Sequence, residues 1–159
     1  MKIRRVTPEI YPKALGLLKQ TFPKSNYEIS LVEKLHNGNK EIDEWVCIHI
    51  NKVIAYIAFT KAYNGKDVCG LHLAPVAVKP EYQRQGIGSE LIAFALRQEK
   101  IKNNTLFVLG NPEYYKKFGF TQCQNPVCSF ANKKRHFLSI RNEFTESFTV
   151  GYEREFGKF

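Results

Sequence analysis

VAVKPEYQRQGIGS, residues 76–89, is the most informative segment of this chain. An apolar strand end runs into a short polar turn, and two glycines, Gly86 and Gly88, then open an amphipathic helix. A helix N-terminus carries unpaired backbone N–H groups and the positive end of the helix dipole, so this arrangement favours a bound diphosphate. A Cβ at either glycine would hold the phosphate away from those amides.

The spacing does not fit two other diphosphate motifs. A P-loop, Gly-x-x-x-x-Gly-Lys-Ser/Thr, does not occur, and the dinucleotide fingerprint needs a third glycine where Leu91 stands. That fingerprint also places its first glycine directly after the strand, whereas residues 79–85 intervene here. Taken alone, the segment leaves a glycine-bearing surface turn as the alternative.

A second segment, TLFVLGNPEYYKKFGF at residues 105–120, adds an independent signal. Residues 105–110 predict a buried strand, because they are short, apolar and bounded by polar residues and glycine. Asn111 and Pro112 fit an N-cap followed by proline at the first helical position. The short helix that follows would end at Gly119, which suits the left-handed residue after a helix.

Together the two segments resemble the GNAT N-acetyltransferases. QRQGIG at residues 83–88 is similar to the family's Q/R-x-x-G-x-G/A signature, and YKKFGF at residues 115–120 resembles the Y-x-x-x-G-F ending of its core. The run from residue 107 to residue 120 is similar to the YhbS-like branch. The resemblance implies an α/β fold with a splayed central mixed β-sheet flanked by helices, in a single domain over residues 1–159.

The remaining patterns predict the element order β-α-α-β-β-β-α-β-α-β-β, which is the GNAT order. A capping box at Ser25 and Glu28 is expected to start the second helix. We predict strands at residues 2–7, 45–50, 53–59, 71–78, 105–110, 137–140 and 148–152, with the last two paired as a hairpin, a polar loop at residues 63–67, and helices at about 7–20, 25–37, 87–100 and 113–118.

Bulk properties agree with a single globular domain. A chain of 159 residues has room for one domain with a proper core, and 43% hydrophobic residues argue against disorder. No apolar run approaches the ~18–20 residues of a membrane span. Residues 1–5 are basic, but no apolar signal-peptide core follows them, so we expect a cytoplasmic protein.

The four cysteines predict structural thiols rather than a metal site. Cys47, Cys69, Cys123 and Cys128 form no C-x-x-C pair, and no histidine stands at finger-like spacing from them. We therefore expect reduced thiols and no metal.

The net charge of +9 has two interpretations. Its densest clusters are residues 133–135 and the trio Lys2, Arg4 and Arg5, which would attract anions such as CoA or nucleic acid. The other interpretation is a solubilising surface, and we favour it because no basic stripe with interleaved aromatics occurs. Nucleic acid is therefore not an expected partner.

The resemblance implies acetyl-CoA as co-substrate and assigns its contacts. The backbone of Val76 and Val78 would hold the pantetheine arm, with the Val76 N–H directed at the thioester carbonyl. Asn111 stands where the family often contacts the CoA arm, although capping its helix explains it equally well. The pyrophosphate would be wrapped by Gln83, Arg84, Gln85, Gly86, Ile87, Gly88 and Ser89.

Two residues are candidates for proton transfer. Tyr115 matches the family's general-acid tyrosine, and a phenol with a reference pKa near ~10 is protonated at neutral pH; aromatic packing is the alternative. His72 falls on the strand position where the histone acetyltransferase branch carries its catalytic glutamate. An imidazole with a reference pKa near ~6.5 suits a base, whereas a buried histidine with a structural hydrogen bond is the alternative.

The resulting hypothesis is an acetyl-CoA-dependent N-acetyltransferase that uses direct ternary-complex transfer to a primary amine. No cysteine lies in a recognisable nucleophile motif, so an acyl-enzyme is not indicated. The alternatives are transfer of a longer acyl group and a non-catalytic GNAT-fold module that binds acyl-CoA or a polyanion. The acceptor, a small-molecule or peptide amine, is not identified by the sequence, and a homodimer is possible for this family.

Overall fold

The computed structural model describes residues 1–157, in which the strands form one seven-stranded sheet of order β1-β2-β3-β4-β5-β7-β6. The sheet is mixed, because β1 pairs with β2 antiparallel and β4 pairs with β5 parallel, and this confirms the predicted fold class. The elements in chain order are β1 (Lys2–Arg5), α1 (Tyr11–Thr21), α2 (Tyr27–Asn37), β2 (Ile42–His49), β3 (Lys52–Asn64), β4 (Asp67–Val78), η1 (Pro80–Tyr82), α3 (Ile87–Leu96), β5 (Leu106–Leu109), α4 (Pro112–Tyr115), η2 (Lys116–Phe118), β6 (Thr121–Gln122), η3 (Lys134–His136), β7 (Phe137–Ile140) and η4 (Arg154–Phe156).

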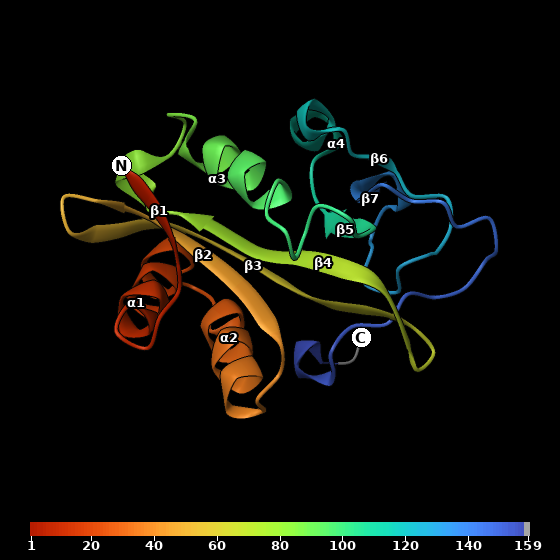
Figure 1. Ribbon diagram of the computed structural model, residues 1–159, viewed down its shortest axis with the longest axis horizontal. Coiled ribbons are helices and arrows are strands. Elements are labelled where there is room, and N and C mark those ends of the chain that lie inside the picture. Colours follow the sequence, from red (N-terminus) through yellow and green to blue (C-terminus); the bar gives the residue numbers. More distant parts are fainter. Residues whose placement is uncertain (158–159) are drawn as a thin grey trace. The chain divides into compact units, whose positions relative to one another are not determined.

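The chain divides into two compact units, and the first comprises residues 1–59 and 74–98. Its strands carry α1 and α2 on one face and α3 on the other (Figure 1). Apolar residues recur at helical spacing in α1, where Ala14, Leu17 and Leu18 are buried, and they pack in one core cluster with Val32 of α2 and Val46 of β2. Ala77 of β4 belongs to the same cluster, so this core fixes the end of β4.

The second unit comprises residues 60–73 and the chain from Glu99 onward. Here β5 pairs parallel with β4, through Leu71↔Leu106 and His72↔Phe107, and antiparallel with β7. Its core cluster includes Phe107 of β5 and Phe137 of β7, whose rings stack with centroids 5.6 Å apart. This core carries β5 and the segment that leads from it into α4.

Both N-terminal helices begin later than the sequence predicts. α1 begins at Tyr11 rather than near Thr7, whose Oγ1 accepts a hydrogen bond from the Ile10 N–H at 3.3 Å. The predicted capping box at Ser25 is wrong. The N-cap of α2 is Asn26, without a side-chain cap bond, and the Ser25 Oγ instead accepts from the Tyr27 N–H at 3.1 Å, because neighbouring Ser and Asn compete for the same local backbone donors.

The bounds of β2, β3, α3 and the loop after β3 also differ from the predicted ones. β2 and β3 are longer than expected, and their turn lies at Ile50 and Asn51, which both have positive φ (50° and 59°), as in the primed turns that match strand twist. The polar loop predicted at residues 63–67 is reduced to the two residues between β3 and β4. α3 ends at Leu96 rather than near Lys100.

The predicted C-terminal hairpin is wrong. β7 pairs with β5 and β6, while residues 148–152 form only isolated bridges, Tyr63↔Gly151 and Val127↔Thr149. Of the two partners of β7, β5 is distant in the sequence and β6 is very short, so a local sequence pattern does not reveal this pairing.

Three further observations concern the described part of the chain. All four cysteines are free, with Cys47 and Cys123 buried. Residues 1–157 contain no group of three or more His, Cys, Asp or Glu side chains arranged to hold a metal ion. In the same residues, no helix combines the length and apolarity needed to cross a bilayer.

Candidate functional site

The connection from β4 to α3 in the first unit has the geometry of an anion-binding turn. After β4 ends at Val78, the Lys79 N–H donates to the Ile54 carbonyl at 2.8 Å, which ties the start of the turn to β3. The one-turn helix η1 follows, and Gly86 then takes the N-cap position of α3 with φ 82°. The left-handed conformation at Gly86 is the reason a glycine is needed there.

The N-terminus of α3 is open to a ligand. No side chain caps it, and the first amides of a helix have no intrahelical acceptor. A Cβ built at Gly86 meets no protein atom within 4 Å, so the space above this residue is empty of protein. The helix dipole and these amides together favour negative charge at this point.

Side chains of the turn brace it from within. The Gln83 Nε2 donates to the Val78 carbonyl at 2.9 Å, and the Gln85 Nε2 donates to the Glu81 carbonyl at 3.2 Å. Glu81, the acidic residue of the turn, lies 3.6 Å from the Lys79 Nζ, which offsets its charge. Arg84 is exposed and has φ 64°. Gln83 and Gln85 therefore hold the turn's shape, while Arg84 leaves a cation at its surface.

The other predicted CoA contacts of this unit lie directly before the turn. Val76 and Val78 are half-buried residues at the end of β4. Gly88 and Ser89 are half-buried in the first turn of α3, and Ile87 is buried in its packing face. The structure thus brings Val78, Gln83, Arg84, Gln85 and the start of α3 into one connected segment.

Tyr115 lies at the end of α4 in the second unit and is buried. It is surrounded by aromatic rings, with centroids 5.0 Å from Tyr114 and 5.7 Å from Phe120, both nearly edge-on. Burial, and to a lesser degree Tyr114, raises the pKa of Tyr115 to about 12. The phenol is therefore neutral and able to donate a proton or hydrogen bond throughout the physiological range.

The residues around Tyr115 are arranged by local turn chemistry. The Asn111 Oδ1 accepts from the Glu113 N–H at 2.9 Å, so Asn111 caps α4 as the sequence indicates. Gly119 ends η2 with φ 99°, as predicted. A Cβ at Gly110 would lie 2.4 Å from the Tyr115 Cε2, so this glycine makes room for the ring.

His72 lies in β4, inside the second unit, and is only 1% exposed. Its Nε2 donates to the Gly151 carbonyl at 3.0 Å, and its ring stacks on Tyr152 with centroids 3.6 Å apart. Burial lowers the pKa of His72 to about 4, although the bond to Gly151 raises it. Nδ1 is the free nitrogen, and it is buried without a hydrogen-bond partner among the described residues.

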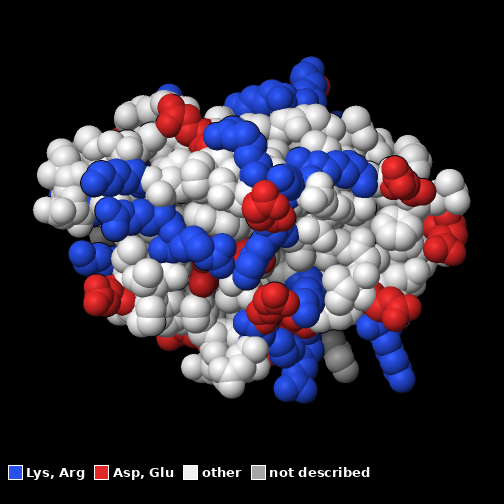
Figure 2. Space-filling model, viewed as in Figure 1, with Lys and Arg blue, Asp and Glu red and all other residues white. Residues whose placement is uncertain are grey.

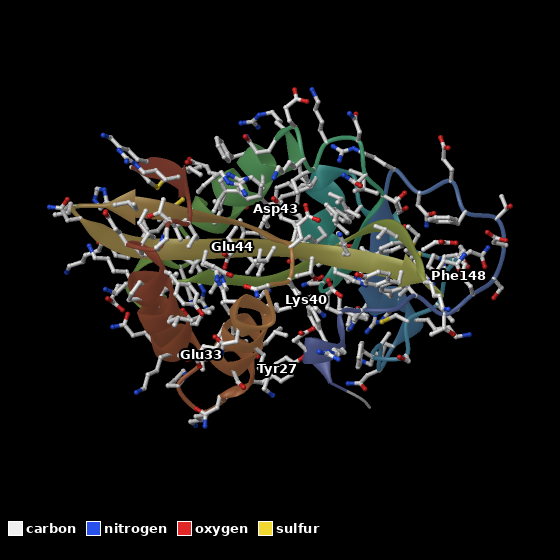
Figure 3. All side chains as sticks on the ribbon, turned by 60° about the horizontal axis from the view of Figure 1, so that its bottom comes forward. Tyr27, Glu33, Lys40, Asp43, Glu44 and Phe148 are labelled. Carbon is white, nitrogen blue, oxygen red and sulfur yellow. The ribbon has the colours of Figure 1, made fainter. Side chains whose placement is uncertain are left out.

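Sequence reasoning missed a buried polar cluster in the first unit, centred on Glu44 of β2 (Figure 3). Its Oε1 is 2.9 Å from the His36 Nε2, and its Oε2 accepts a hydrogen bond from the Tyr56 hydroxyl. The rings of Tyr11 and His36 are tilted against each other with centroids 4.1 Å apart, and burial together with Glu44 raises the pKa of Tyr56 well above its ordinary value. The signal was the strand alternation, which puts Glu44 on the same inward face as Val46.

Sequence comparison identifies relatives of this chain. Residues 41–122 match the acetyltransferase (GNAT) domain family. The uncharacterised N-acetyltransferase YhbS of Escherichia coli K12 is 30% identical over 123 residues, which cover 76% of this chain and 73% of YhbS. The uncharacterised N-acetyltransferase YjhQ of the same strain is 41% identical over 76 residues; that match spans 45% of this chain and 42% of YjhQ.

Solved structures of GNAT-family proteins resemble this chain as well. The crystal structure of E. coli YhbS in complex with CoA superposes with a TM-score of 0.88 at 25% identity, covering 99% of this chain and 92% of YhbS. A GNAT-family acetyltransferase of Brucella melitensis in complex with acetyl-CoA has a TM-score of 0.82 at 24% identity, covering 98% and 97% of the two chains, and shows the shared fold.

Proposed function

This chain belongs to the GNAT family of N-acetyltransferases, in its YhbS-like branch, and from that membership we propose that it transfers an acetyl group from acetyl-CoA to a primary amine. The observation that carries the proposal is the uncapped N-terminus of α3 behind the left-handed Gly86, a site suited to a diphosphate. We also propose that residues 1–159 work as a single domain, which the near-complete coverage by the YhbS structure supports.

Acetyl-CoA is the proposed co-substrate, with its pyrophosphate on the segment from Gln83 to Ser89. The amides at the start of α3 would donate to the phosphate oxygens, and the exposed Arg84 would add a cation beside them. The hydrogen bonds of Gln83 and Gln85 to the turn's own backbone support a shape that exists before the ligand binds. The CoA and acetyl-CoA complexes of the structural relatives support this choice of co-substrate.

For the rest of the cofactor, the family resemblance assigns roles to backbone groups of β4. The backbone of Val76 and Val78 would bind the pantetheine arm as an added strand does. The Val76 N–H would donate a hydrogen bond to the thioester carbonyl, and this bond would strengthen as the oxyanion forms. Asn111, which already caps α4, would contact the CoA arm.

The reaction we propose is direct acyl transfer. The neutral amine nitrogen attacks the thioester carbonyl carbon, a C–N bond forms, and the tetrahedral intermediate collapses with cleavage of the C–S bond. A base takes the proton that the amine loses, and the departing thiolate accepts a hydrogen bond or proton from Tyr115. A phenol with a pKa of about 12 is a weak acid toward a thiol whose pKa is near ~8.5, so hydrogen-bond donation to the developing charge is its main contribution.

His72 is the proposed base, and its surroundings set strict conditions on that role. Its Nε2 is engaged with the Gly151 carbonyl, so only the buried Nδ1 could accept the proton. With a pKa near 4, the imidazole is neutral at pH 7 but weakly basic. The role therefore needs a bound amine or water to reach Nδ1; without one, His72 is a core residue of the second unit.

The experiment that tests the function is calorimetric binding of acetyl-CoA to the wild type and to Gly86→Glu. Gly65→Glu is a matched control, because Gly65 also has positive φ (63°) and no protein atom within 4 Å of an added Cβ. We expect saturable binding by the wild type and the control. Binding by Gly86→Glu should be at least tenfold weaker, because the introduced carboxylate would take the place of the ligand's negative charge at the helix end. Equal binding by both variants would overturn the assignment of the turn.

Turnover separates an enzyme from a non-catalytic module. Tyr115→Phe keeps the ring that packs against Phe120 and removes only the hydroxyl. If the chain is an acetyltransferase, this variant binds acetyl-CoA normally while kcat falls about 10²-fold, the usual size of an acid–base contribution. Primary amines of several classes serve as acceptors in the screen. Unchanged kcat would remove Tyr115 from the mechanism, and binding without turnover on any amine would favour the acyl-CoA-binding module.

A further inference from the structure

The first unit contains an open cavity of about 790 Å³ outside the β4–α3 turn. It is formed by β1, by the segment that leads into α1, and by the tip of the β2–β3 hairpin. None of the residues Gln83 to Ser89 lines it. A volume of this size falls in the range of small-molecule sites, roughly 300–1,000 Å³.

The cavity carries an excess of positive charge. Lys2, Arg4 and Lys13 line it, and none of them is ion-paired with a carboxylate among residues 1–157. Arg5 also lines the cavity, but its guanidinium is already ion-paired. Its Nη2 lies 3.2 Å from the Asp43 Oδ1, and the group lies over the ring of Trp45. In Figure 2, Lys and Arg side chains gather over β1 and the hairpin tip.

The three unpaired cationic side chains and the carboxylate of Glu9 give the lining of the cavity a net side-chain charge of +2. This matches a phosphate monoester, which carries about −1.5 to −2 at neutral pH. Arg4 can bind two phosphate oxygens with its planar fork, and the lysines add point charges.

The cavity also has an apolar wall. Ile10, Ile48 and Val53 line it beside the cations. A ligand that used both surfaces would have a phosphate group at one end and a flat or apolar body at the other. We propose that this cavity, formed by β1, the start of α1 and the β2–β3 hairpin, binds a phosphorylated small molecule of the nucleotide type, separately from acetyl-CoA.

The cavity is separate from the turn, and one aromatic contact links it to η1, which precedes the turn. His49 lines the cavity, and its ring lies edge-on to Tyr82 of η1 with centroids 6.0 Å apart. η1 directly precedes the Gln83–Ser89 segment. A ligand in the cavity is therefore one aromatic contact away from the turn, and CoA must be present in the test so that the two positions are distinguished.

The test is calorimetric titration of AMP, a nucleoside phosphate monoester, into the protein saturated with CoA, which occupies the turn. The variant Lys2→Gln/Arg4→Gln removes two charges from the cavity, and Lys24→Gln/Lys66→Gln removes two charges from exposed positions elsewhere. Adenosine serves as the uncharged probe. We expect one saturable AMP site in the wild type and the control, at least about tenfold weaker affinity in the cavity variant, and no measurable binding of adenosine.

Several results would overturn the proposal. One is the absence of saturable AMP binding while CoA is bound, and another is competition between AMP and CoA for one site. Equal weakening in both double variants would reduce the effect to general surface charge. Circular dichroism and the Tm of each variant, measured first, ensure that a loss of binding reflects the cavity and not the fold. CoA affinity, measured in parallel, should be unchanged in the cavity variant, so a failure of the CoA turn is recognised separately.

Discussion

The ring of Tyr115 occupies the space in which a side chain at residue 110 would lie. A Cβ at Gly110 would stand 2.4 Å from the Tyr115 Cε2 and 2.9 Å from its Cδ2, closer than real Cβ contacts allow. The ring is also enclosed by Tyr114 and Phe120, so it has little freedom to move aside. Gly110 therefore fixes the position of the proposed acid from the end of β5.

Replacing Gly110 by alanine should displace Tyr115. We expect Gly110→Ala to lower the free energy of unfolding by about 1–3 kcal/mol, as overpacking does, and to lower kcat toward the value of Tyr115→Phe. Gly16→Ala is the matched control, because Gly16 lies within α1 with no protein atom within 4 Å of an added Cβ. That control should stabilise the protein by about 0.5–1 kcal/mol. Urea denaturation and steady-state kinetics measure both effects, and a fully active, stable Gly110→Ala would contradict the argument.

The pH dependence of turnover should have no alkaline limb from Tyr115 in the accessible range. A general acid acts while protonated, so activity is lost as pH rises through its pKa, and burial moves that pKa from 10.0 to about 12. We expect kcat to stay level up to about pH 10, in the wild type and in Tyr114→Phe alike. A decline centred near pH 10 that disappears in Tyr115→Phe would show that the Tyr115 pKa is not raised.

Local signals in the sequence predicted the turn and α4 well, because each depends on neighbours in the chain. The glycine-rich turn and the stop at Gly119 need left-handed backbone, and Gly86 and Gly119 adopt it (φ 82° and 99°). The family and fold class followed from the same segments. The CoA and catalytic roles of individual residues stay predictions, as does a cytoplasmic location.

Non-local pairing explains most of the differences. The environment of His72 depends on Gly151 and Tyr152, far away in sequence, so neither its burial nor its stacking was visible in the strand that contains it. The predicted final hairpin paired two adjacent strands, whereas β7 selects β5 and β6. The Glu44 cluster similarly joins two strands and a helix end. The sequence pattern of a single strand does not reveal the side-chain partners that other elements contribute.

Stability should fall in acid partly because of His72. Its pKa is lowered from 6.5 to about 4, so between these values the unfolded chain binds a proton that the folded protein excludes. The contribution is fully present above pH 6.5 and is lost as pH falls toward 4, up to about 3 kcal/mol. His72→Phe keeps an aromatic ring against Tyr152 and cannot titrate.

Urea denaturation of the wild type and His72→Phe at pH 7.5 and pH 4.5 isolates this contribution, since all other groups titrate in both proteins. The wild type should lose more stability than the variant across that interval. The same variant tests the base: if His72 removes the amine's proton, kcat/KM should fall by about 10²-fold or more. Unchanged kcat/KM together with a flatter stability profile would leave His72 with a structural role.

Glu44 should tolerate truncation poorly, because it is a buried acceptor for two side chains. Glu44→Ala would leave the buried Tyr56 hydroxyl without its acceptor and His36 without its carboxylate, at a cost of about 3 kcal/mol. Glu33→Ala, on the exposed face of α2 (Figure 3), should change the free energy of unfolding by less than about 0.5 kcal/mol. A double-mutant cycle of Glu44→Gln with Tyr56→Phe measures the pairwise coupling by urea denaturation. Additive effects in that cycle would mean that the hydrogen bond between Tyr56 and Glu44 contributes nothing specific and that the cost of Glu44→Ala comes from the cavity it leaves.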